Sequence, residues 1–480
     1  ALLPFDTSQQ SSAVLPSSWG LYSQLALIET QAIRSHSPSR RALYFTSRSP
    51  HLAPSSFVGW RQKIRCFGSL RFVFYSPEKS VVTQVRELSV SPSTDLSDLV
   101  LALPEGNYKL VVIANPTPKL VARTAVGSPL SQLTGYEHYY TDELATQGSQ
   151  LTVCLLNEQG PVTVTSAAFS STTPQVRIQL ESVLARVLVY GEPRLAGGAK
   201  RGSAPAGYVL SPQARYTAPL RPLGLLRTGG SEVAGDGSHP EDRYPTSRMC
   251  QEWKDSAPRS LTELLSHFAL DRMTSHEGGE DIYLARLLPD EQALATAVSN
   301  IHAYARETTL PPTAYLVGAL PSLVIRFPYI PGGLTLRENE GWVSFRGKYY
   351  TESQMKEWIR SDDFDDSTLA EAVKAARINE DSFTAPFEKG DLRFYYRGYN
   401  YYVVPIRHFD DTKAPTKTSI GRYGVVRGAE YRIHLTQILR PWTPVPPDLT
   451  ADLTPVAEEK NVHAIVSVRP IVVHSSEIHI

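Results

Sequence analysis

Short segments rich in valine, isoleucine, tyrosine and threonine recur along the whole chain, and turn residues separate them. The clearest are residues 71–90, 108–114, 151–155, 401–406 and 431–438. Residues of these types favour β-strands, and short apolar runs between turns are typical of buried strands. The chain also contains 36 prolines. Because proline limits long helices and suits loops and edge strands, the sequence predicts a mainly β protein.

Helical patterns are few and lie in the second half of the chain. Ser260 and Asp290 each stand where an N-cap would precede apolar residues at helical spacing, and a third pattern begins at Ser367. Each of the three predicts a short helix. The stretch 176–190 is ambiguous, because its alternating apolar residues fit either two strands or one bent strand.

The chain is long enough for several domains, since 480 residues exceed the size of a typical single domain. Residues 194–258 are rich in glycine, serine, proline and charge, which makes them the best boundary. We therefore expect an N-terminal β-sandwich over residues 1–225, a C-terminal β-sandwich over residues 226–462, and a terminal segment over residues 463–480.

The charge balance restricts the partners. Lys+Arg and Asp+Glu both number 48, so the net charge is zero, which argues against nucleic acid. No apolar stretch reaches the 18 residues that a membrane span needs. The three cysteines, Cys66, Cys154 and Cys250, are too widely spaced for a zinc motif, and their pairing stays open.

Motifs of catalysis or of metal binding are missing from the sequence. There is no GxSxG, GxxxxGK[ST] or HExxH pattern. Two acidic clusters come closest: His276, Glu277, Glu280 and Asp281 around a glycine pair, and Asp362, Asp363, Asp365 and Asp366. The first reads as a solvated loop. The second lacks the glycine and glutamate of a calcium loop and suits the start of a helix. We predict no catalytic residue, no metal site and no cofactor.

Two further groups of residues could be read as functional, but we interpret both as structural. Arg407 and His408 follow an apolar strand and are interpreted as a structural pair at its end. Five nearby tyrosines form either an aromatic binding platform or, as we prefer, cross-strand pairs of a hairpin: Tyr395, Tyr396, Tyr399, Tyr401 and Tyr402.

Four segments of the second half occur in an order that resembles a known family. They are FRGKYYTESQMKEW at 345–358, YYRGYNYYVVPIRHF at 395–409, GRYGVVRGAEYRIHLTQI at 421–438, and the strand pair at 463–480. The series resembles the C-terminal domain of the type V fimbrillins of Bacteroidota, nearest to their minor-fimbria branch. The RYGVVR-x3-Y part is the most specific piece.

This resemblance implies two transthyretin-like β-sandwich domains and a particular route of export and processing. Family members are exported as lipoprotein precursors, and an arginine-specific surface protease removes an N-terminal segment that includes a first β-strand. Ala1 is then the new N-terminus. The cut leaves an apolar groove in the N-terminal domain, and a C-terminal strand of a neighbouring subunit fills it.

The end of the chain suits the role of the donated strand. Residues 464–470 alternate in polarity, Pro470 interrupts them, and a second apolar stretch follows. The expected donor-strand residues are Ile465, Val466, Val468, Ile471, Val472, Val473, Ile478 and Ile480. The alternative is that residues 463–480 complete the chain's own sheet. A division between the two roles is also possible, with 463–469 staying and 471–480 donated.

The expected function is that of a structural shaft subunit of a cell-surface fimbria on the outer membrane, which polymerises by donor-strand exchange and mediates adhesion. Its expected partners are other copies of itself, anchor and tip subunits, the processing protease, and host or bacterial surface proteins. An accessory or tip adhesin of the same fimbria is the alternative. A surface glycan-binding module or hydrolase is the third, more remote hypothesis.

Overall fold

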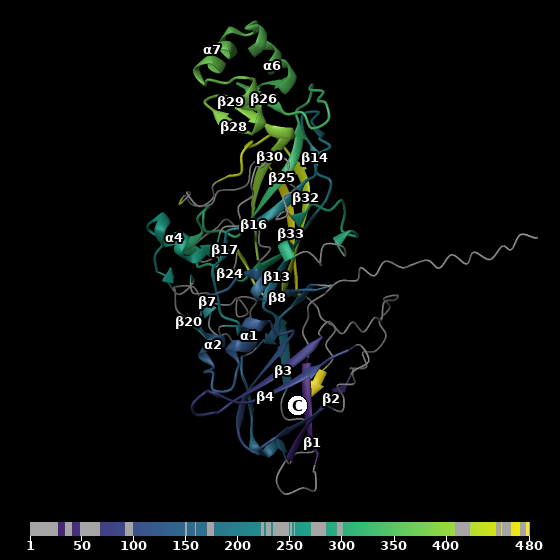
Figure 1. The fold of residues 1–480 in the computed structure, drawn as a ribbon, viewed down its shortest axis with the longest axis vertical. Coiled ribbons are helices and arrows are strands. Elements are labelled where there is room, and N and C mark those ends of the chain that lie inside the picture. The colour runs from purple at the N-terminus through teal and green to yellow at the C-terminus, as the bar shows by residue number, and fades with distance from the viewer. Residues whose placement is uncertain are drawn as a thin grey trace, which may run out of the picture.

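The computed structural model describes residues 68–91, 99–148, 151–158, 160–169, 177–221, 255–269, 285–294, 301–408 and 423–447. It also describes the strands 27–33, 41–48, 462–470 and 477–479 and a few short pieces between 225 and 253 and at 453. These residues form a mainly β protein, as the sequence predicts. No helix among them is long and apolar enough to cross a membrane. The molecule is elongated, with the first sheet at one end and a small helical module at the other (Figure 1).

The first sheet is built around two central strands that are buried on both faces. These are β3 (Ser69–Tyr75) and β6 (Tyr108–Ala114), which pair antiparallel. Along β3, Phe72 and Phe74 contact one apolar cluster while Val73 and Tyr75 contact another. Because successive side chains point to opposite faces, a strand covered on both sides must be apolar throughout. This explains the unbroken YKLVVIA run.

Further strands extend this sheet in both directions. The order is β4 (Val82–Ser89), β3, β6, β10 (Leu155–Asn157), β12 (Arg177–Ser182), β1 (Leu27–Ile33), β34 (Glu477–His479), β2 (Arg41–Arg48) and β5 (Leu99–Leu103). The second apolar cluster contains residues of α1 (Pro118–Arg123), α2 (Ser131–Thr134) and the hairpin β8 (Ala145–Gln147)–β9 (Leu151–Val153). These elements cover one face of the sheet.

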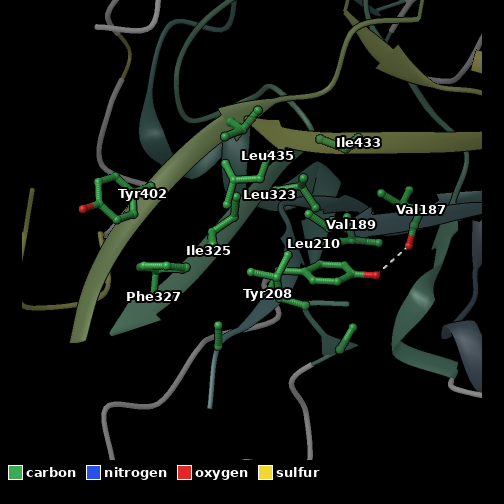
Figure 2. Close-up of a cluster of buried hydrophobic side chains, with 14 of the residues drawn as sticks. Val187, Val189, Tyr208, Leu210, Leu323, Ile325, Phe327, Tyr402, Ile433 and Leu435 are labelled. Atoms are coloured by element: carbon green, nitrogen blue, oxygen red, sulfur yellow. Dashed lines mark hydrogen bonds between the residues drawn. The ribbon is translucent and has the colours of Figure 1, made fainter. Parts of the chain in front are cut away.

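Two further sheets pack face to face as a β-sandwich. One has the order β14 (Arg194–Leu195), β32 (Ala429–Ile438), β13 (Leu184–Tyr190), β23 (Tyr304–Arg306), with β33 (Val462–Pro470) on β32. The other has the order β15 (Lys200–Arg201), β25 (Ser322–Ile330), β16 (Gly207–Ser211), β22 (Ala285–Arg286), with β30 (Tyr399–Pro405) on β25. Figure 2 shows their shared core, where Val189 and Ile433 of one sheet meet Leu323 and Ile325 of the other.

The strand pairing bears on where the chain divides. β12 and β13 are consecutive strands separated by Val183, yet β12 pairs in the first sheet and β13 pairs with β32. β16 likewise pairs with β25 of the sandwich. The predicted division at residue 225 stays a prediction. We propose instead that the boundary lies at Val183, because residues 184–211 pair with strands of the second half.

A small module is inserted between β25 and β30 of the sandwich. It contains β26 (Trp342–Phe345), β27 (Lys348–Thr351), α6 (Glu352–Ser361), α7 (Ser367–Ala375), β28 (Phe387–Lys389) and β29 (Leu392–Tyr395). It has an apolar core of its own, which includes Phe345, Met355 and Leu369. The Trp342 indole stacks on Tyr395 at 3.7 Å between ring centroids and donates a hydrogen bond of 2.8 Å to the Tyr329 carbonyl of β25. The module is thereby held firmly on the end of the sandwich.

Two of the three predicted helices are present. Ser260 caps α4 (Leu261–His267) by accepting the Glu263 amide N–H at 3.2 Å. α7 begins at Ser367, with Asp366 as its N-cap. The helix predicted from Asp290 falls largely on residues 295–300, outside the described residues. The two short helices α1 and α2 also occur in the first half.

Candidate polymerisation site

The last described strand of the chain lies in the first sheet. β34 pairs in parallel with β1, where Ile478 faces Ile28, and antiparallel with β2, where Ile478 faces Ser47. His479 also faces Arg177 of β12. Figure 1 places the C-terminal strand beside β1 and β2, at the end of the molecule that is remote from the inserted module. The C-terminus therefore completes a sheet whose other strands come from the first 182 residues.

The strand before it belongs to the sandwich. β33 pairs antiparallel with β32 over its whole length, from Val462 opposite Ile438 to Pro470 opposite Ala429. The predicted donor residues Ile465, Val466 and Val468 lie in β33, and Ile478 lies in β34. The remaining ones, Ile471, Val472, Val473 and Ile480, and the predicted new N-terminus Ala1, lie outside the described residues.

The tail is thus divided between two sheets. Residues 462–470 form part of the chain's own sandwich, and residues 477–479 join the first sheet. Both described parts of the tail therefore pair within their own chain, in two different sheets. The donor role of these residues stays a prediction.

The RYGVVR segment lies at the junction between the first sheet and the sandwich. The Arg427 side chain is 98% buried, and its Nε and Nη2 donate to the two Glu307 carboxylate oxygens at 3.0 and 3.1 Å. Its remaining donors bind the carbonyls of Pro219 and Ala218 at 2.7 and 2.8 Å. The two hydrogen bonds to Glu307 make this a bidentate pair, which fixes the orientation of the guanidinium relative to the carboxylate.

A second buried ion pair lies against the same segment. Arg221 binds both carboxylate oxygens of Glu181, which is the penultimate residue of β12. Burial raises the pKa of Glu181 to about 7, and the Arg221 and Arg427 charges oppose that rise. Gly428 has a φ of +68°, and a Cβ there would lie 3.4 Å from the Glu181 carboxylate. A glycine suits this position because it adopts positive φ without strain.

His408 and Tyr431 complete the junction. The Tyr431 hydroxyl accepts the Val426 amide N–H at 2.8 Å and lies 2.8 Å from His408 Nδ1. Burial, helped by the Arg221 charge, lowers the pKa of His408 to about 4. The imidazole is therefore neutral at pH 7, and its Nδ1 shares a hydrogen bond with the Tyr431 hydroxyl. Sequence alone placed His408 at a strand end without identifying this partner, because Tyr431 is 23 residues away.

Two of the groups considered for binding or metal chemistry have structural roles in the described part of the chain. The rings of Tyr395, Tyr401 and Tyr402 are at least 98% buried, so they contribute to the core rather than to a surface platform. The predicted hairpin is wrong, because Tyr395 lies in β29, which pairs with β26 and β28, whereas Tyr401 and Tyr402 lie in β30, which pairs with β25. Asp366 accepts the Thr368 and Leu369 amides and pairs with Lys348 at 2.8 Å, which makes it a helix cap. Within the described ranges, no group of three or more histidine, cysteine, aspartate or glutamate side chains could hold a metal ion. The cluster around His276 lies outside those ranges.

The family of this region can be stated from its sequence. The family model described as "Major fimbrial subunit protein type IV, Fimbrillin, C-terminal" matches residues 393–477. Residues 393–477, called the fimbrillin region below, are thus similar to the C-terminal part of fimbrillins. The fimbrillin region contains β30, the RYGVVR segment, β32 and β33, and it ends at the first residue of β34. It thus covers the motifs at 395–409 and 421–438, whereas the segment 345–358 lies before it.

Solved structures of fimbrial proteins are similar to this chain at low identity. The fimbrillin FimA of Porphyromonas gingivalis is 13% identical, with 94% of this chain and 98% of that chain covered and a TM-score of 0.39. The tip fimbrial protein Mfa3 of Porphyromonas gingivalis is 9% identical, with 84% and 94% covered and a TM-score of 0.29. A search of curated protein sequences finds no match to this chain.

Proposed function

We propose that this protein is a structural subunit of a cell-surface fimbria and that it polymerises by donating the end of its chain to the first sheet of another copy. The fimbrillin C-terminal region supports the assignment to fimbriae. The observation that carries the polymerisation proposal is the position of β34, because a C-terminal strand that fits this sheet within one chain also fits the same sheet of a second copy.

The presence of both parts of such a contact in one chain supports a role in the shaft. The chain contains the acceptor sheet and the strand that enters it, so each copy can accept one neighbour and serve another. A head-to-tail contact of this kind does not close on itself and extends as a filament. The same proposal includes membership of the minor-fimbria branch, a role in adhesion and the absence of catalytic activity. It also includes an arginine-specific processing protease, anchor and tip subunits, and host or bacterial surface proteins as partners.

Two truncations test the proposal. A chain ending at Pro470 retains β33 and lacks only the segment that reaches the first sheet, whereas a chain ending at Lys460 lacks β33 as well. We expect SDS-resistant ladders and filaments in negative stain from the intact chain only. The chain ending at Pro470 should be folded and monomeric. The chain ending at Lys460 should also be less stable, since β32 loses its antiparallel neighbour.

The outcomes distinguish the alternatives. Filaments from the chain ending at Pro470 would exclude donation by the terminal segment. An intact chain that is folded and never forms ladders at any concentration would exclude the shaft role and leave the accessory or tip role as the better account.

A further inference from the structure

The site of β34 is a short slot with a neighbouring strand on each side. β1 and β2 pair directly with each other where Thr30–Ile33 face Ala42–Phe45. Toward their other ends, β34 lies between them, opposite Leu27–Glu29 of β1 and Thr46–Arg48 of β2. The slot therefore holds one strand at a time, and a tail from another copy can occupy it only when the chain's own β34 has left.

The link between the two tail strands is short. Six residues, 471–476, separate Pro470 from Glu477. Fully extended, this connection spans at most about 25 Å. Pro470 faces Ala429, which directly follows Gly428 at the junction, and Gly428 donates its N–H to the Leu184 carbonyl at 3.2 Å. The tail thus starts at the junction with the first sheet, close enough for the chain to fill its own slot.

The two tail strands differ in how firmly the backbone holds them. β33 pairs with β32 over nine residues, whereas β34 is three residues long. Short terminal strands open at low free-energy cost, while longer paired strands open only with much of the fold. Opening at β34 therefore leaves the sandwich intact.

We propose that the free subunit is a closed monomer, in which β34 occupies the slot of its own first sheet and blocks assembly until it leaves. This inference rests on the proposed polymerisation and adds its regulation. The same strand contact forms within one chain or between two, as in domain swapping. Within one chain the short tether gives β34 a high effective concentration at its own slot. The closed monomer therefore persists in dilute solution, and assembly requires an opening step.

A register-specific disulfide tests the closed state. All three natural cysteines, Cys66, Cys154 and Cys250, are replaced by serine, and Ser47→Cys is combined with Ile478→Cys, two positions that face each other across β2 and β34. The matched control combines Ala42→Cys with Ile478→Cys. Ala42 lies five residues before Ser47 in β2 and faces Ala102 of β5. The control position is therefore displaced along the strand by about 16 Å from the residue that faces Ile478.

We expect the oxidised S47C/I478C chain to carry its disulfide within the monomer, seen as faster migration in non-reducing gels, and to lose filament formation. Reduction should restore filaments, and the A42C/I478C chain should form neither the monomeric disulfide nor the block. An equimolar mixture of the two single variants, S47C and I478C, can form the bond only between chains. It should do so only once filaments appear.

Contrary results separate this inference from the proposed function. If dilute single variants cross-link at once, and the double variant yields linked ladders without a cross-linked monomer, the closed monomer is wrong and strand donation stands. If the reduced chain forms no filament and no intermolecular bond, the proposed function itself is wrong, and the inference falls with it.

Discussion

Arg427 illustrates how one side chain can join segments that are far apart in the sequence. It binds Glu307, 120 residues earlier, and the carbonyls of Ala218 and Pro219, more than 200 residues earlier. Each nitrogen of its guanidinium donates to at least one acceptor, and the pair is almost fully buried. A buried guanidinium and carboxylate that satisfy each other in this way are costly to separate, because either one alone remains buried without a counter-charge.

Removing the Arg427 fork should destabilise the protein strongly. We expect Arg427→Met to lower the free energy of unfolding in urea by about 3–5 kcal/mol, because it leaves the Glu307 carboxylate buried and unpaired. The matched control is Arg346→Met, whose partner Asp391 is exposed to solvent, with a cost below about 1 kcal/mol. Equal effects of the two substitutions would show that burial does not decide the contribution of Arg427.

The pH dependence of stability should report on His408. Its folded-state pKa of about 4 lies below the usual value of 6.5. Above pH 6.5 the imidazole is neutral in both states and has no effect. As the pH falls from 6.5 to 4, the unfolded state takes up a proton that the folded state refuses, so the free energy of unfolding decreases, by about 1–3 kcal/mol.

A variant isolates this contribution from that of the other titrating groups. His408→Gln keeps an acceptor for the Tyr431 hydroxyl and cannot be protonated. Urea unfolding between pH 7 and pH 4 should therefore give a flatter profile for the variant than for the natural chain. Parallel profiles would show that His408 does not titrate differently in the folded and unfolded states.

At the scale of elements, the sequence carries the local signals and not the pairing. The helices predicted from Ser260 and Ser367 are confirmed, because the capping side chains, Ser260 and Asp366, act within one turn. α6 was missed although Thr351 and Gln354 form a capping box there, a local signal that was available. Residues 176–190 contain two strands, but their division between two sheets depends on partners in the distant β10 and β32.

The candidate site shows the same limit. Alternating apolar residues and Pro470 allowed a division of the tail into two strands, and the structure divides it at that proline. The slot between β1 and β2 could not be predicted, because it depends on the pairing of β1 with β12 and β34, which lie more than a hundred residues away in the sequence. Arg427 and Tyr431 belong to the RYGVVR-x3-Y motif, but their roles depend on Glu307 and His408, which lie far from them in the sequence.

The joint between the inserted module and the sandwich should depend on Trp342. This side chain is fully buried, stacks on Tyr395 and donates to the Tyr329 carbonyl. We expect Trp342→Ala to cost about 3–5 kcal/mol in urea unfolding, because it removes a large buried ring and leaves a cavity. Trp358→Ala on α6 is the matched control. Its ring is partly exposed, so a smaller loss is expected, and a loss as large would refute a special role for the joint.

The two regions proposed to make contact in a filament are the slot between β1 and β2 and the tail that follows Pro470. Both lie away from the inserted module. The first sheet lies at one end of the elongated shape and the module at the other (Figure 1). In an assembly, the tether of about 25 Å requires the acceptor sheet of the next copy to lie close to the donor's Pro470. Pro470 faces Ala429 at the junction, while the module adjoins the opposite end of β25 and β30. The module should therefore stay uncovered along a filament.

Cysteine labelling can measure that exposure. In the chain without natural cysteines, Asp391→Cys places a thiol in the turn between β28 and β29 of the module, where the Asp391 side chain is 56% exposed. Its rate of reaction with a maleimide should be the same in monomers and in filaments, because no neighbouring subunit reaches the module. Ile478→Cys is the control for a protected thiol. It should react slowly in monomers and in filaments, because its strand is paired on both sides in either state. Protection of the Asp391→Cys thiol on assembly would place the module in the contact between subunits and rule out a filament built through the short tether alone.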